Sequence, residues 1–291
     1  MRKWVFWLTL LLLLAADALH DTAGSAGKVR ELADSGALMT SGTGSNELLA
    51  IGKSQIYRGN LVLVNRDYPV HPEGVTGDVV QLSGHRELLY GYGLLDNSIR
   101  LSERVAERFV EMVEAAGRDG VSQFLISSGY RSPEEQEQLY ADKGSDYALP
   151  PGYSEHNLGL SLDIGSSRQE MSRAPEGVWL RQHAAEFGFV LRYPQDKTGI
   201  TGIAYEPWHF RYVGLPHSLI MQEKNFTLEE YLEFLKERKS YAATVGGKAY
   251  LITYHAVSGN TVIPVPADRR YELSGDNVGG VIVTIFPENQ E

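Results

Sequence analysis

Three separated motifs constrain the fold of this chain, because their reactive side chains can act together only if the fold brings them to one place. In chain order the motifs are Ser128-Gly129-Tyr130-Arg131-Ser132, then Ser154-Glu155-His156 with Asp163 following, and finally Glu206-Pro207-Trp208-His209. They offer two imidazoles, several carboxylates and an arginine. A zinc peptidase that acts on a free carboxyl end needs that set, because zinc takes three protein ligands and a nearby carboxylate must take a proton from water.

The residues around the second and third motifs predict two neighbouring strands. Residues 160–164 alternate around Asp163, and residues 210–213 alternate after His209. Two adjacent strands could aim His156, Asp163 and His209 at one point. The pattern therefore indicates a sheet that could carry a metal site, although a single histidine is more often structural than a ligand.

Two features of this pattern leave other interpretations open. Glu206 lies three residues before His209 and would face the other way on a regular strand, although Pro207 breaks regular pairing and a turn could bring both side chains inward. Two histidines and one carboxylate also hold iron in some oxygenases. Those sites usually place a histidine and the carboxylate two residues apart, whereas His156 and Asp163 are seven apart.

Composition narrows the chemistry further. The 291-residue chain has no cysteine, so disulfides and thiolate zinc sites are excluded and any metal must bind His, Asp or Glu. The formal net charge is -10, and no Lys/Arg cluster is typical of a nucleic-acid-binding surface. We therefore expect no nucleic acid partner.

The N-terminus predicts export. Arg2 and Lys3 precede an apolar run of 13 residues from Trp4 to Ala16. That run is shorter than the roughly 20 residues of a membrane span and is typical of a signal-peptide core. We therefore expect residues 1–18 to be a signal peptide or an N-terminal membrane anchor, with the protein secreted or anchored on the extracytoplasmic side. Residues 19–55, rich in Gly, Ser, Ala and Thr, are predicted to be a flexible linker.

The rest of the chain predicts a catalytic domain over residues 56–239 and a small all-β accessory domain over residues 240–291. A short buried strand is expected at residues 61–64. A helix that begins after Ser132 would place Arg131 beside its N-terminus, where an anion is favoured. Helices are predicted over residues 101–116, 132–140, 176–187 and 227–239.

The extended motifs closely resemble those of the VanY family of zinc D,D-carboxypeptidases, which also includes related L,D-carboxypeptidases of peptidoglycan. The residues that carry the resemblance are 128–132 with Gln136, then 151–163, and 206–214. It covers roughly residues 56–287. The resemblance implies an α+β fold, in which a central antiparallel sheet carries the zinc site and helices pack around it.

The same resemblance implies a role for each motif residue. One zinc ion is expected to bind His156, Asp163 and His209. Glu206 is implied as the general base. Arg131 would hold the substrate carbonyl or carboxylate and stabilise the developing oxyanion.

Three further residues match positions near the substrate. Gln136 and Ser154 match positions that contact the peptide end in related enzymes. Trp208 either walls the pocket or belongs to the core.

The implied reaction is the removal of the C-terminal D-alanine from a peptidoglycan precursor that ends in D-Ala-D-Ala. Loss of that residue destroys the vancomycin target, so a role in glycopeptide resistance is implied by analogy. One alternative is an L,D-carboxypeptidase that acts on tetrapeptide stems. Another is a non-catalytic, zinc-containing module that binds the cell wall, although Glu206 argues against it because binding needs no general base.

A serine mechanism like that of penicillin-binding proteins is disfavoured. Ser25-Ala26-Gly27-Lys28 matches their S-x-x-K motif and residues 197–199 match K-T-G, but S-D-N is missing. Ser25 also falls in the predicted linker. We therefore expect activity that chelators abolish and penicillin leaves unchanged.

Overall fold

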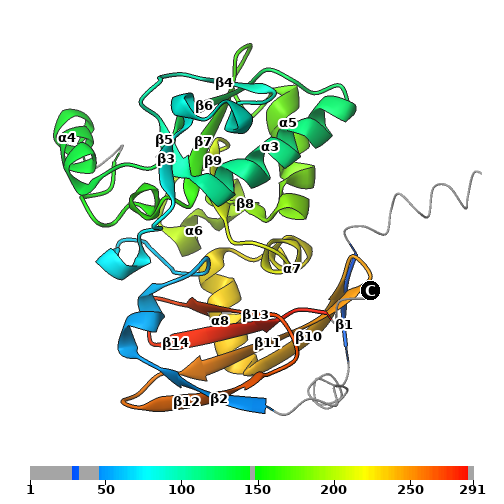
Figure 1. Cartoon of the computed structure of the whole chain (residues 1–291). Helices are drawn as coiled ribbons and strands as arrows, with labels where there is room; N and C mark the ends of the chain where they lie inside the picture. The colour runs from blue at the N-terminus through cyan, green and yellow to red at the C-terminus, as the bar shows by residue number, and fades with distance from the viewer. Residues whose placement is uncertain (1–27, 33–45, 145–147, 288–291) are drawn as a thin grey trace, which may run out of the picture.

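The computed structural model describes residues 28–32, 46–144 and 148–287. Figure 1 shows two stacked parts, with helices and a sheet above and mostly strands below. Among these residues, no helix is both long and apolar enough to cross a membrane. The predicted leader over residues 1–18 lies outside the described residues.

A five-stranded sheet forms the centre of the upper part. Its strand order is β4-β6-β7-β9-β8, and every neighbouring pair is antiparallel except β4 with β6. The strands are β4 (Tyr92–Leu94), β6 (Phe124–Ser128), β7 (Ser161–Ser166), β8 (Phe189–Leu191) and β9 (His209–Tyr212). A separate antiparallel pair is formed by β3 (Val79–Gln81) and β5 (Arg100–Ser102). The predicted α+β class with a central antiparallel sheet is confirmed, with one parallel pair at the sheet's edge.

Four of the helices lie close to the predicted ranges, and two others, over residues 198–201 and 217–224, were not predicted. They are α3 (Glu103–Arg118), α4 (Pro133–Lys143), α5 (Pro175–His183), α6 (Thr198–Thr201), α7 (His217–Lys224) and α8 (Leu228–Arg238). Ser132 and Thr227 start α4 and α8 with capping boxes, since each side chain accepts a hydrogen bond from the backbone of the glutamate three residues later. The predicted helix over residues 176–187 ends as a 3-10 turn, η6 (Ala184–Phe187), before Gly188 with φ 91°.

Residues 61–64 are buried as predicted, but they do not form a strand. Two side chains from distant segments bind their carbonyls instead. Arg211 Nη2 donates to the Val62 carbonyl at 2.9 Å, and Asn277 Nδ2 donates to the Leu63 carbonyl at 2.8 Å. The strand prediction is wrong because these side chains satisfy the backbone that a neighbouring strand would otherwise pair.

The lower part consists of antiparallel strands, as expected for the C-terminal residues. A five-stranded sheet has the order β1-β10-β11-β14-β13, and β12 pairs separately with β2. The strands are β1 (Val29–Glu31), β2 (Asn46–Ile51), β10 (Ser240–Val245), β11 (Lys248–Ala256), β12 (Thr261–Pro266), β13 (Tyr271–Gly275) and β14 (Gly280–Ile285).

Two of these strands come from residues 19–55, which the sequence predicts to be a flexible linker. β1 pairs with β10, with Val29 opposite Val245, and β2 pairs with β12 over all its residues. The linker prediction is therefore wrong for residues 29–31 and 46–51. The open edges of β10 and β12 supply backbone partners that local composition does not reveal.

One hydrophobic core joins the two parts. Its buried members from the upper part and from the lower strands include Leu61, Val213, Leu219, Tyr231, Tyr241, Ile252 and Ile282. Backbone bonds add to this contact, since Gly275 N–H donates to the Arg58 carbonyl at 2.6 Å. The lower strands are thus packed onto the upper part.

His217 lies in this shared core and is expected to make the protein sensitive to acid. Its Nδ1 lies 2.8 Å from the Tyr231 hydroxyl on α8, and its Nε2 lies 2.9 Å from Thr284 Oγ1 on β14. Burial lowers the pKa of His217 from 6.5 to about 3. Between these values the unfolded chain binds a proton that the native ring does not, so stability falls as pH falls. This group contributes a loss of about 1.4 kcal/mol per pH unit.

Urea unfolding between about pH 7 and about pH 4.5 measures this effect. We expect the His217→Gln variant to be less stable at neutral pH, and its free energy of unfolding to depend less steeply on pH than that of the wild type. His85→Gln, which changes a partly exposed histidine, is the matched control and should keep the wild-type slope. An unchanged slope in His217→Gln would contradict the assignment.

Candidate metal centre and active site

Two adjacent strands and a short helix bring the predicted metal ligands together. Asp163 on β7 lies directly opposite His209 on β9. His156 lies in the 3-10 helix η5 (Glu155–Leu158), which precedes β7. His209 Nδ1 is 3.1 Å and His156 Nε2 is 3.4 Å from Asp163 Oδ1. Ligand atoms of all three residues lie within 4.8 Å of one another.

The donor set fits a zinc ion. Two ligand atoms that are each about 2.0–2.1 Å from a tetrahedral zinc lie roughly 3.3–3.5 Å apart, close to the 3.1 and 3.4 Å separations here. Asp163 Oδ1 is buried and has no hydrogen-bond partner among the described residues, which leaves its lone pairs for a cation. Burial would raise the pKa of Asp163, but the neighbouring His156 and His209 lower it below its usual range, so the carboxylate is charged at neutral pH.

Both imidazoles turn their second nitrogen toward an oxygen. His156 Nδ1 lies 2.7 Å from the Gly129 carbonyl, and His209 Nε2 lies 3.5 Å from Glu155 Oε2. Outer oxygens of this kind fix the tautomer and the orientation of a ligating imidazole. Gly129 packs against the backbone of Arg100 because it has no side chain: a Cβ there would lie 2.1 Å from the Arg100 carbonyl oxygen.

A turn places Glu206 beside the metal centre. The Glu206 N–H donates to the Tyr193 carbonyl at 3.1 Å and the His209 N–H donates to the Glu206 carbonyl at 3.2 Å, so the chain folds back at Pro207. Glu206 Oε2 consequently lies 3.7 Å from His209 Nδ1, the nitrogen that faces Asp163. Burial raises the pKa of Glu206 despite the opposing effect of His209. A raised pKa makes this carboxylate a better proton acceptor at neutral pH.

Arg131 lies between β6 and α4, and neighbouring side chains hold its guanidinium. Nε donates to Gln136 Oε1 at 2.9 Å, Nη1 to Ser128 Oγ at 3.0 Å and Nη2 to Ser154 Oγ at 3.4 Å. Burial lowers the pKa of Arg131, and the charges of Asp163 and Glu206 oppose this effect. The guanidinium is therefore a fixed cation within the electrostatic reach of the metal centre.

Two of the three predicted substrate-contacting residues lie beside Arg131, and the third is exposed. Gln136 and Ser154 gather around Arg131, and Gln136 is itself held by a 2.7 Å bond from its Nε2 to the Leu149 carbonyl. Trp208 is 42% exposed, so the alternative that it belongs to the core is wrong.

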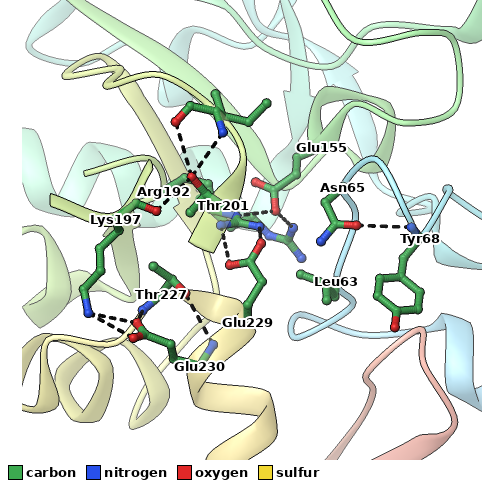
Figure 2. Close-up of polar contacts among 12 residues, drawn as sticks. Leu63, Asn65, Tyr68, Glu155, Arg192, Lys197, Thr201, Thr227, Glu229 and Glu230 are labelled. Atoms are coloured by element: carbon green, nitrogen blue, oxygen red, sulfur yellow. Dashed lines mark hydrogen bonds and ion pairs between the residues drawn. The ribbon is translucent and has the colours of Figure 1, made fainter. Parts of the chain in front are cut away.

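The sequence motifs gave no indication of a buried ion cluster behind the metal centre. Glu155 is fully buried, and Arg192 Nε and Arg211 Nη1 each donate to its Oε1 at 2.8 Å. Figure 2 shows Arg192 between Glu155 and Glu229, whose carboxylate accepts two bonds of 2.9 and 2.7 Å. Burial would raise the pKa of Glu155, but the two arginines lower it well below its usual range. Glu155 directly precedes the predicted ligand His156, but the spacing of the motif does not reveal that its side chain is buried.

Comparison with known proteins gives a consistent picture. The family model VanY: D-alanyl-D-alanine carboxypeptidase matches residues 98–215. A D-alanyl-D-alanine carboxypeptidase of Enterococcus faecium is 52% identical over 99% of this chain and 97% of its own length. The crystal structure of the vancomycin resistance D,D-dipeptidase VanXYg, in complex with a D-Ala-D-Ala phosphinate analog, has a TM-score of 0.72 at 35% identity, covering 84% of this chain and 100% of that one. A mutant of the D,D-pentapeptidase VanY from a VanB-type resistance cassette, in complex with Zn(II), has a TM-score of 0.50 at 33% identity, covering 60% and 98%.

Proposed function

Because this chain belongs to the VanY family of D-alanyl-D-alanine carboxypeptidases, we propose that it is a zinc-dependent hydrolase that removes the C-terminal D-alanine from peptidoglycan precursor pentapeptides. The observation that carries the proposal is the convergence of His156, Asp163 and His209 on one point, with the Glu206 carboxylate beside it. This removal would contribute to glycopeptide resistance, because vancomycin binds the D-Ala-D-Ala end.

His156, Asp163 and His209 would hold the zinc ion. When bound, zinc supplies a Lewis acid that polarises the scissile carbonyl and lowers the pKa of water. Glu206 Oε2 takes the proton of the attacking water and later gives it to the leaving amine of D-alanine. A pKa raised toward neutral pH suits both steps, because Glu206 must first accept a proton from water and then release it to the amine.

Arg131 would recognise the substrate and stabilise negative charge that develops on the carbonyl oxygen. Its three side-chain partners hold the guanidinium in one orientation, so little rotamer freedom is lost when substrate binds. Gln136 and Ser154 would complete the contacts to the peptide end. Trp208, exposed next to Glu206 and His209 in sequence, would form a wall of the entrance.

The location of the substrate implies where the enzyme acts. We propose that residues 1–18 direct the chain out of the cytoplasm or anchor it to the membrane, so that the enzyme works on the cell-wall side. We also propose that residues 56–239 supply the catalytic machinery and that residues 240–291 support it, since they share one core with it.

Release of D-alanine by the full chain from a stem pentapeptide ending in Lys-D-Ala-D-Ala tests the proposal. We expect release that EDTA abolishes, that added zinc restores and that penicillin leaves unchanged. D-alanine from a tetrapeptide stem but not from the pentapeptide would instead identify an L,D-carboxypeptidase, and cleavage of only the free D-Ala-D-Ala dipeptide would identify a dipeptidase. Zinc binding without any release would indicate a wall-binding module.

A further inference from the structure

The two oxygens of the Glu155 carboxylate have different partners. Oε1 accepts hydrogen bonds from Arg192 and Arg211, both at 2.8 Å. Oε2 accepts one from Ser161 Oγ at 3.1 Å and faces His209 Nε2 at 3.5 Å. The arginines thus hold one oxygen, while the other is directed at the outer nitrogen of a metal-site histidine.

Stability alone does not explain this buried arrangement of charges, which indicates that it has a function. Burying Glu155 and two arginines removes three charges from water, and well-packed apolar side chains of similar volume are often as stable or more so. The outer nitrogen of the second histidine, His156, needs only the backbone carbonyl of Gly129. The outer nitrogen of His209 faces a charged group instead, and no main-chain carbonyl among the described residues bonds it.

A carboxylate that faces an imidazole nitrogen determines where the ring proton lies. Carboxylates face both ring nitrogens of His209: Asp163 Oδ1 lies 3.1 Å from Nδ1 and Glu155 Oε2 lies 3.5 Å from Nε2. When a metal takes the lone pair of Nδ1, the ring proton of His209 must lie on Nε2, where the Glu155 carboxylate can accept it. The negative charge behind the ring also raises the basicity of the ligating nitrogen.

We propose that Glu155 is a positioning residue for the metal ligand His209, and that Arg192 and Arg211 hold it in the orientation this requires. The inference rests on the zinc-binding function proposed above. It adds an ion cluster, distinct from the ligands and the substrate-binding residues, that determines how tightly zinc is held.

The cluster continues into the lower part of the molecule. Arg192 binds both oxygens of Glu229, which lies in the first turn of α8. α8 packs on β10 and β11 of the C-terminal sheet through Tyr231 and Leu235. Glu229 is therefore the outer anchor of the cluster, and its removal should loosen Glu155 without touching the metal ligands.

Zinc affinity, measured by competition with a chromophoric chelator, tests this inference in the full chain. We expect Glu155→Gln to lower zinc affinity by about 10- to 100-fold and to change the visible absorption spectrum of the cobalt-substituted protein. Glu229→Gln should lower zinc affinity less, in the same direction. Near-ultraviolet circular dichroism checks that each variant is folded.

Glu230→Gln is the matched control. Glu230 neighbours Glu229 on α8 and pairs with Lys197 at 3.0 Å, but Figure 2 shows that this pair is separate from the Glu155 cluster. The variant loses a comparable ion pair in the same helical turn and keeps the shape of the side chain, so it reports what the loss of such a pair alone does to zinc binding. Its zinc affinity should equal that of the wild type.

A folded Glu155→Gln variant with wild-type zinc affinity and an unchanged cobalt spectrum would overturn the inference. If that variant does not fold, Ser161→Ala and Glu229→Gln decide, and wild-type affinity in both would overturn it as well. Equal losses in Glu229→Gln and Glu230→Gln would also overturn it, because the effect would then follow stability. A wild-type chain that binds no zinc would instead refute the proposed function on which the inference rests.

Discussion

Replacing Glu206 by glutamine is expected to lower kcat for D-alanine release by about 10²- to 10⁴-fold, while the protein keeps its zinc. Glutamine has nearly the same shape but accepts no proton at neutral pH. The ligand atoms of His156, Asp163 and His209 remain in place, because the Glu206 side chain lies beside them but is not one of the three ligands. Steady-state kinetics on the pentapeptide, together with zinc content by atomic absorption, measures both quantities.

Glu111→Gln is a suitable control for this experiment, because it removes an exposed carboxylate that pairs with Arg108 on the same helix. Its kcat should equal that of the wild type. Full activity in Glu206→Gln would show that another group takes the proton. Loss of zinc in the same variant would show that Glu206 is a ligand and would change the proposed mechanism.

Replacing Arg131 by alanine is expected to lower kcat/KM by about 10²- to 10³-fold. The substitution removes a buried cation that three side chains orient, and with it the charge that opposes the developing oxyanion. Arg131→Lys should recover only part of this loss, because an ammonium group does not reproduce the planar fork of a guanidinium. Kinetics on the pentapeptide, with zinc content measured in parallel, distinguishes lost catalysis from lost metal.

The matched control is Arg100→Ala, which removes a neighbouring arginine that pairs with Glu135 and lies over the Tyr130 ring. It should retain kcat/KM within a few-fold of the wild type. If Arg131→Ala is as active as Arg100→Ala, Arg131 neither binds substrate nor stabilises the oxyanion.

Local patterns were sufficient to predict four of the helices and the two strands that carry Asp163 and His209. The capping residues Ser132 and Thr227 fix two helix starts through bonds that span only three residues, so they can be read directly from the sequence. Alternation around Asp163 and after His209 predicts strands for the same reason, and their antiparallel register then places the two side chains opposite each other.

Features that depend on distant partners could not be predicted in this way. Residues 61–64 look like a strand, but Arg211 and Asn277 bind their carbonyls from far away in the sequence. Residues 29–31 look like part of a linker until β10 provides an edge. The importance of Glu155 likewise depends on burial and on two arginines from other segments, which neither spacing nor composition encodes.

The pairing of β1 with β10 and of β2 with β12 also sets the order in which the molecule can assemble. Synthesis delivers β1 and β2 first, yet Val29 meets Val245 and Ile51 meets Thr261, which are made near the end of the chain. Strands that pair over such long separations form slowly, because the chain loses the entropy of closing a large loop before the stabilising contacts form. Until then the edges of four strands stay open to other chains. A newly made molecule is therefore most prone to aggregate in the interval between completing its catalytic sheet and joining its two ends.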